Sequence, residues 1–150
     1  MPPVTFKTFL LAGLAGELLF EAYAWLLSPL LFGVALAPAN LVVALTQIAT
    51  GLTLPYWLGF GLHFAIGALG FTATVLLVHW LSRSSLILSG ALAGVGLWFV
   101  AQGLLAPAVG RSFMMGFGAY TQSSFVGHVA MAMAIGWVLQ KLSTQRAAAP

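Results

Sequence analysis

Long runs of apolar residues dominate the chain, separated by short stretches that contain proline, glycine or charged side chains. A helix needs about 20 apolar residues to cross about 30 Å of hydrocarbon at a rise of about 1.5 Å per residue. The runs that meet this length predict membrane-spanning helices at about 8–30, 56–81, 85–106 and 122–142. Pro29, Pro55 and Pro107 lie at their edges, where a residue without a backbone N–H suits a helix start or end.

Two further segments lie between these runs. The segment at about 38–54 is apolar but carries polar positions such as Asn40 and Gln47, which favours an interfacial or re-entrant helix. The segment at about 108–121 is rich in glycine and aromatic residues, and we expect a loop that folds over the outer side. The predicted fold is all-α, an integral membrane four-helix bundle formed by residues 1–150 as one domain, with these two segments as an outer cap.

Composition supports a membrane protein. The chain is 61% hydrophobic and only 5% charged, whereas a soluble domain carries about 25% charged residues. It has no cysteine, which excludes disulfides, thiolate metal sites and cysteine nucleophiles. It has no phosphate-binding loop or Gly-x-Ser-x-Gly motif, and Ser123 and Ser124 are interpreted as helix caps rather than nucleophiles. We therefore do not expect an enzyme.

The basic residues predict the orientation. Lys7, Arg83, Lys141 and Arg146 all fall on one side of a four-helix topology, so the positive-inside rule predicts that both termini are cytoplasmic. Arg111 is alone on the opposite side, and we expect it to make a contact in the outer loop. The positive charges are few and scattered, which is not the pattern of a nucleic-acid-binding surface.

The chemistry is concentrated in the acidic residues. Glu17 and Glu21 are the only two in the chain, and both lie in the first apolar run. A carboxylate in hydrocarbon is costly, so two of them need a partner helix, a water-filled cavity or a neighbouring protein. Their spacing of four residues places them on roughly the same face of a helix.

Two histidines are expected at a similar depth. His63 and His128 each lie about two turns in from the outer end of a predicted helix, near the level of Glu21. A Glu–His pair lowers the cost of burying either group. Four interpretations stay open for this set: a structural polar network, a proton or cation pathway, a metal site, and a b-type haem held by the two histidines.

Two patterns concern helix packing. The residues Leu14–Gly16, Leu19, Leu26, Leu27 and Pro29 recur at a constant offset as Leu92–Gly94, Leu97, Leu104, Leu105 and Pro107. This recurrence predicts a duplicated two-helix repeat whose units enter the membrane in the same direction. Small residues also recur four apart, at Ala12 and Gly16, Gly90 and Gly94, and Ala130 and Ala134, and they predict close helix contacts.

One feature resembles a known group of proteins. The segments GLHFAIGALG (61–70) and GHVAMAMAIG (127–136) are apolar and place a glycine shortly before a histidine, followed by small residues. Together with the loop that begins Gly110-Arg111-Ser112-Phe113, they are similar to small bacterial inner-membrane four-helix proteins of unknown function. The resemblance implies a multi-pass protein of the bacterial inner (cytoplasmic) membrane and implies no activity.

The function that we expect first is a non-catalytic accessory subunit that docks on a larger respiratory or photosynthetic membrane complex. A bundle this small has little interior for a substrate and a large apolar surface. The alternative is a small ion- or proton-coupled transporter that uses Glu17 and Glu21, and the third is a haem-bearing electron carrier. Expected partners are membrane lipids, other membrane subunits or further copies of the chain. No cofactor is expected unless the haem or metal interpretation holds.

Overall fold

The structure, a computed structural model, describes residues 4–147. Within these residues it contains helices and connecting segments and no strand. Four helices are long and apolar enough to cross a membrane: Phe6–Phe32, Tyr56–Ser82, Leu86–Ala108 and Ala119–Gln145. The all-α class is therefore confirmed, and each of the four predicted runs forms a helix long and apolar enough to span a membrane.

Three of the four spans contain a short π-helical segment. The first consists of α1 (Phe6–Ala22), η1 (Tyr23–Leu27) and α2 (Ser28–Phe32), and the second of α4 (Tyr56–Ala65), η2 (Ile66–Phe71) and α5 (Thr72–Ser82). The third consists of α6 (Leu86–Phe99), η3 (Val100–Leu105) and α7 (Ala106–Ala108). The fourth belongs to α8 (Ala119–Ala147). Between spans lie α3 (Ala39–Thr50) and the short helical segment η4 (Phe113–Phe117).

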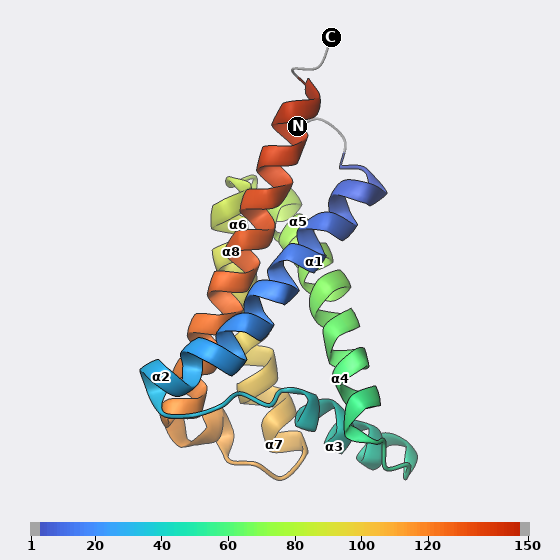
Figure 1. The fold of residues 1–150 in the computed structure, drawn as a ribbon, viewed down its shortest axis with the longest axis vertical. Helices are drawn as coiled ribbons and strands as arrows, with labels where there is room; N and C mark the ends of the chain where they lie inside the picture. Colours follow the sequence, from blue (N-terminus) through green and yellow to red (C-terminus); the bar gives the residue numbers. More distant parts are fainter. Residues whose placement is uncertain (1–3, 148–150) are drawn as a thin grey trace.

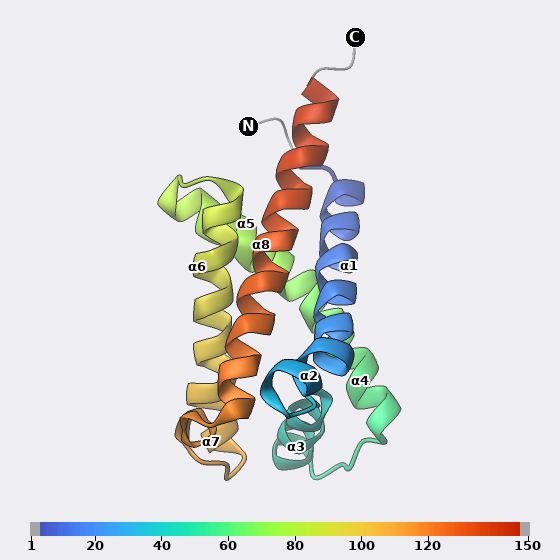
Figure 2. The same ribbon diagram turned by 60° about the vertical axis from the view of Figure 1, so that its left-hand side comes forward.

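The spans alternate in direction along the molecule. The start of α1 and the end of α8 lie at one end, and α3 and α7 lie at the other (Figure 1). Helix α8 packs against both α6 and α1, and it lies between them in Figure 2. The second span contacts the first mainly through η2. The buried apolar core joins these helices through side chains such as Phe20, Val75, Met131, Ile135 and Leu139.

Prolines explain two of the π-helical segments. Pro29 and Pro107 lie just after η1 and η3, and each removes one backbone hydrogen bond and presses its ring against the preceding turn. A wider turn relieves that clash without ending the helix. The segment η2 contains glycines instead, and Gly67 within it lies directly against the first span.

The connection before α8 is packed against the helices. In η4 the backbone is left-handed at Met114, Met115 and Phe117, with φ of 50°, 48° and 55°, a conformation that costs about 1–2 kcal/mol per residue. Burial of Met114, and a hydrogen bond from the Thr121 hydroxyl to its carbonyl oxygen, offset this cost. The segment contacts η3, α7 and α8, as expected of a loop that covers this end.

Small residues bring α6 and α8 together, although not all are the predicted ones. A Cβ added to Gly94 would lie 2.7 Å from the His128 carbonyl oxygen, and one on Gly90 would overlap the Ala132 carbonyl oxygen. The contacting row on α8 therefore runs through His128, Ala132 and Gly136, which share one helix face. The predicted pair Ala130 and Ala134 does not belong to this row: Ala130 is exposed and Ala134 is half-buried.

The cap interpretation of Ser123 and Ser124 is also wrong. Helix α8 begins earlier, at Ala119, so both serines lie within it. The Ser123 hydroxyl lies 2.8 Å from the Tyr23 hydroxyl and 2.6 Å from the Ser28 hydroxyl, which joins α8 to the first span. The serines serve as hydrogen-bond partners between helices, a common role for hydroxyl groups in membrane proteins.

Two glycines of α6, Gly94 and Gly96, provide a test of the close contact between α6 and α8. Gly94→Ala should destabilise the protein by about 1–3 kcal/mol, because the added methyl group meets α8 backbone. Gly96→Ala is the matched control, because nothing lies within 4 Å of a Cβ there, and alanine should stabilise that helix by about 0.5–1 kcal/mol. Thermal unfolding in detergent measures both variants. Equal melting temperatures for the two would contradict the α6–α8 packing.

Candidate functional site

Three of the predicted site residues come together between the first two spans. Helix α1 presents Glu17 and Glu21 on one face, and α4 presents His63 opposite them. The His63 Nδ1 atom lies 3.4 Å from Glu17 Oε1 and 3.7 Å from Glu21 Oε1. Glu17 is completely buried, whereas Glu21 and His63 keep a small exposed fraction. The sequence-based expectation that a histidine lies beside a carboxyl group is met for His63.

The polar atoms of this cluster are poorly satisfied. Both carboxyl oxygens of Glu17, Oε1 of Glu21 and Nδ1 of His63 are buried without a hydrogen-bond partner. Among the described residues only the Ser143 hydroxyl is in the same condition. Leaving one buried polar atom unpaired costs about 1–3 kcal/mol, and more if it is charged. Four such atoms, three carboxyl oxygens and one imidazole nitrogen, lie together at this one place.

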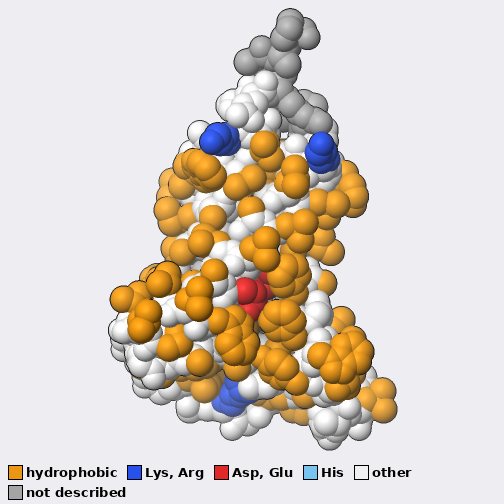
Figure 3. Space-filling model, viewed as in Figure 1, with side chains coloured by type: hydrophobic (Ala, Val, Ile, Leu, Met, Phe, Trp, Pro, Cys, Tyr) orange, Lys and Arg blue, Asp and Glu red, His pale blue; other side chains and the backbone are white. Residues whose placement is uncertain are grey.

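Glu21 connects the cluster to the side of the molecule. Its other oxygen, Oε2, accepts a hydrogen bond of 2.8 Å from the indole N–H of Trp25, at an exposed position. Figure 3 shows one acidic patch surrounded by hydrophobic side chains, and this patch is Glu21 because Glu17 has no exposed area. The cluster therefore has a buried member and a member at the lateral surface.

Gly67 makes room for the buried acid. A Cβ built on this residue of η2 would overlap the Glu17 carboxyl group. Only glycine lets the second span approach Glu17 this closely. Gly67 could not be predicted from the sequence, because one glycine among many in an apolar helix gives no signal until its neighbour is known.

The donor atoms of the cluster fit a small cation. One ligand atom from each of Glu17, Glu21 and His63 lies within 4.8 Å of the others. Carboxylate oxygens and imidazole nitrogens are the usual ligands of zinc, iron and manganese, and a Glu–His pair also holds a proton. A cation or a proton would bind to these unpaired atoms. The residues present therefore fit either a metal ion or a proton.

His128 does not join this cluster. Its Nδ1 atom lies 2.7 Å from the Ser124 carbonyl oxygen, and its ring packs against Phe20 and Phe71. The Phe20 ring contacts both imidazoles, with centroid distances of 5.9 Å to His63 and 5.6 Å to His128. A haem between the two histidines would have to displace this ring, so the side chains do not fit a haem. His79, the third histidine, bonds the Ser84 carbonyl near the opposite end.

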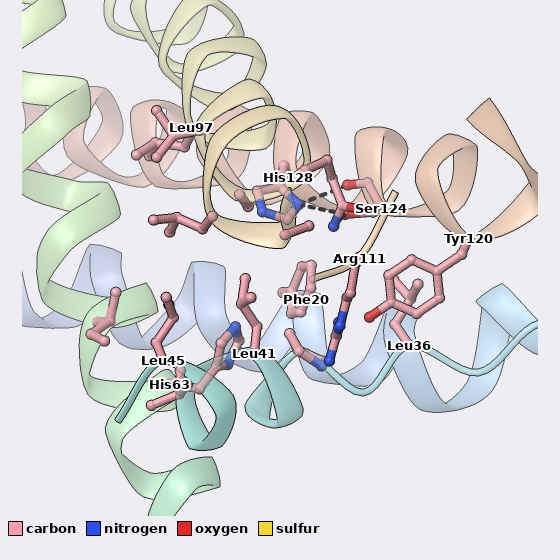
Figure 4. A pocket seen from close by; sticks show the side chains of 18 of the residues that line it. Phe20, Leu36, Leu41, Leu45, His63, Leu97, Arg111, Tyr120, Ser124 and His128 are labelled. Atoms are coloured by element: carbon pink, nitrogen blue, oxygen red, sulfur yellow. Dashed lines mark hydrogen bonds between the residues drawn. The ribbon is translucent and has the colours of Figure 1, made fainter. Parts of the chain in front are cut away.

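Arg111 lies at a different place, a cavity of about 260 Å³ at the end of the molecule that carries α3. His63, His128 and Tyr120 also contribute to its wall (Figure 4). Gln102 lines the cavity as well. The sequence predicted that Arg111 makes a contact in the outer loop, whereas in the structure Arg111 lines this cavity. The sequence-based prediction of site residues did not include Gln102 or Tyr120. Gln102 could have been found, because it is a polar residue that interrupts the apolar run of the third span.

Comparison with known proteins does not extend this picture. No family model matches the chain, and neither does any curated protein or solved structure.

The contact between Gly67 and Glu17 can be tested by substitution. Gly67→Ala should destabilise the protein by about 1–3 kcal/mol, because the new methyl group overlaps a buried carboxyl group. Gly61→Ala, at an exposed position of the same span with nothing within 4 Å, is the control. Unfolding in detergent measures both. Combining Gly67→Ala with Glu17→Ala should cost less than the sum of the two single changes, since the overlap is then gone; strict additivity would refute the contact.

Proposed function

We propose that this chain is a small multi-pass membrane protein that binds a proton or small cation between Glu17, Glu21 and His63 and moves it through the membrane. The observation that carries the proposal is the group of four unpaired buried atoms on these side chains. Glu17 lies near the middle of the 27-residue first span, so a charge held there has entered the hydrocarbon region. Intramembrane acids with histidine neighbours are typical of proton and ion pathways.

The geometry suggests a two-position path. Glu21 lies at the surface and Glu17 is buried, about 6 Å further along the helix axis. The imidazole of His63 reaches both carboxyl groups through the same nitrogen. A proton on Glu21 can therefore pass to His63 Nδ1 and from there to Glu17, which leaves Glu21 ready to accept the next. A divalent metal would instead be held by the two carboxylates and the imidazole together.

The proposal includes an arrangement in the membrane: a four-helix bundle with both termini cytoplasmic, in the bacterial inner membrane. Lys7 lies at the start of α1 and Lys141 near the end of α8, at one end of the molecule, whereas Arg111 follows α7 at the other end (Figure 1). This distribution agrees with the positive-inside rule. The duplicated two-helix repeat is part of the same proposal. Its support is that η1 and η3 precede Pro29 and Pro107 in the two segments with matching sequence.

Reporter fusions test this orientation. A reporter joined after Ser82 should be read out in the cytoplasm, and one joined after Ser112 should be read out on the opposite side. The physical reason is that Arg83 lies in a short connection, where positive charge resists translocation. The same readout at both positions would refute the four-span topology.

An accessory subunit is the second candidate, and the exposed edge of Glu21 favours it. Lipid tails offer no hydrogen-bond donor to a carboxyl group on the lateral surface, whereas a helix of a neighbouring subunit, or of a second copy of this chain, would. Trp25 donates to the oxygen at this surface, Oε2, which can accept a second hydrogen bond, whereas Oε1 is buried at His63. In this alternative the acids contribute to assembly instead of transport.

Flux measurements distinguish the two candidates. Protein reconstituted into liposomes should move protons or Mn²⁺, followed with a trapped fluorescent indicator for each. Glu17→Gln, Glu21→Gln and His63→Gln should each lower the flux roughly tenfold or more, because each removes a group that holds the charge. His79→Gln is the matched control, because His79 lies outside the cluster and should leave the flux unchanged.

Two results would reject transport. Normal flux in the double Glu17→Gln, Glu21→Gln variant would show that the two acids do not carry the proton or cation across the membrane. Folded variants that lose co-purifying subunits, while the wild-type protein shows no flux, would instead support the accessory role. Thermal unfolding of each variant establishes that it is folded.

A further inference from the structure

The cavity beside Arg111 has the properties of a separate ligand site. Its volume of about 260 Å³ exceeds that of an engineered protein cavity of about 150 Å³ that holds benzene. Helix α3 closes one side with Leu41, Val42 and Leu45, and the third span closes the other with Leu97 and Val100. The space is therefore large enough for an apolar group bigger than one aromatic ring, and it is lined mainly by hydrocarbon.

A positive charge lies in the wall of this apolar space. Arg111 is half-buried, and Figure 4 shows its side chain among the cavity residues, near Tyr120. Both acidic side chains of the chain lie at His63 instead, so Arg111 has no carboxylate partner among the described residues. An arginine in an apolar wall without an acidic partner is suited to bind an anionic group from outside the chain, because its guanidinium offers several N–H donors.

We propose that the cavity binds one amphipathic anion, with its acidic head on Arg111 and its hydrocarbon chain among the leucines of α3 and the third span. The Tyr120 hydroxyl supplies a further hydrogen bond to the head. The hydrocarbon lining favours an acyl chain, and the single guanidinium favours one carboxylate or phosphate. A free fatty acid and an anionic phospholipid share this chemistry. Neither Glu17 nor Glu21 lines the cavity, and His63 is the one member of the cation cluster that contributes to its wall.

Native mass spectrometry of the detergent-solubilised full-length chain tests the proposal. The probes are decanoate, phosphatidylglycerol and, as a lipid without net charge, phosphatidylcholine. The wild-type protein should retain one molecule of decanoate or phosphatidylglycerol and should bind phosphatidylcholine roughly tenfold more weakly. Preference for decanoate identifies a fatty-acid site, and preference for phosphatidylglycerol identifies a phospholipid site. Equal retention of all three probes would overturn the proposal.

Variants test separately the binding of the acidic head and the binding of the hydrocarbon chain. Arg111→Gln should weaken anion binding by about tenfold, the equivalent of one charge-assisted hydrogen bond. Arg111→Lys should keep most of the affinity because it keeps the charge. Arg83→Gln, at an exposed position at the opposite end, is the matched control. If Arg83→Gln weakens binding as much as Arg111→Gln does, the effect is a general interfacial one and the proposal fails.

The apolar half is tested on α3. Leu45→Trp adds bulk to a side chain that lines the cavity and should reduce retention of the anion by about tenfold or more. Ile48→Trp, on the exposed side of the same helix, should leave retention unchanged. Melting temperatures establish that each variant is folded. Unchanged binding in both Leu45→Trp and Arg111→Gln would show that the anion binds elsewhere.

Discussion

A carboxyl group inside hydrocarbon needs a proton, a cation or a hydrogen-bond donor, because burying it without one costs several kcal/mol. The structure meets this constraint at one place. Helix α1 carries both acids of the chain, α4 brings His63 against them, and Gly67 lets η2 approach the buried carboxyl group. Three carboxyl oxygens and the imidazole Nδ1 remain buried and unpaired. The remaining requirement for positive charge is the basis of the proposed function.

The packing of the spans places this cluster beside a cavity. At the middle of the molecule, glycines allow the second span to approach the first and α6 to approach α8 with almost no side chain between them. Towards the end that carries α3, α1 and α4 separate (Figure 1). Helix α3 and the loop before α8 cover the space that opens there, and Arg111 reaches into it. His63 borders both the cluster and the cavity.

The sequence predicted the spans well, because length and hydropathy determine them. It also predicted that His63 and His128 lie near the depth of the acids, where a Glu–His pair lowers the cost of burial, while a water-filled cavity or a neighbouring protein stayed open as alternatives. Sequence spacing could not decide which histidine, because His63 and His128 have similar depth and differ only in the direction of their helix faces. The Phe20 ring that separates them from each other is an ordinary apolar residue in the sequence.

Other wrong or missing predictions have the same cause, because the sequence does not show which helix faces meet. The small residues Ala130 and Ala134 have the right spacing, but the contact face of α8 is set by which neighbours it meets, and it runs through His128, Ala132 and Gly136. The cavity could not be predicted either, because it forms from residues of several distant segments. Arg111 and Gln102 were visible as polar residues in apolar surroundings, but only the folded chain shows that both line one space.

The central claim is that Glu17 and Glu21 bind a positive charge, and infrared difference spectroscopy of the protein in lipid tests it most directly. These are the only two acidic side chains in the chain, so a carboxyl band can be assigned with the double Glu17→Gln, Glu21→Gln variant. The account predicts that this band changes when the pH is cycled or when Mn²⁺ is added, and that the double variant shows no such change. A wild-type spectrum that stays constant under both treatments would contradict it.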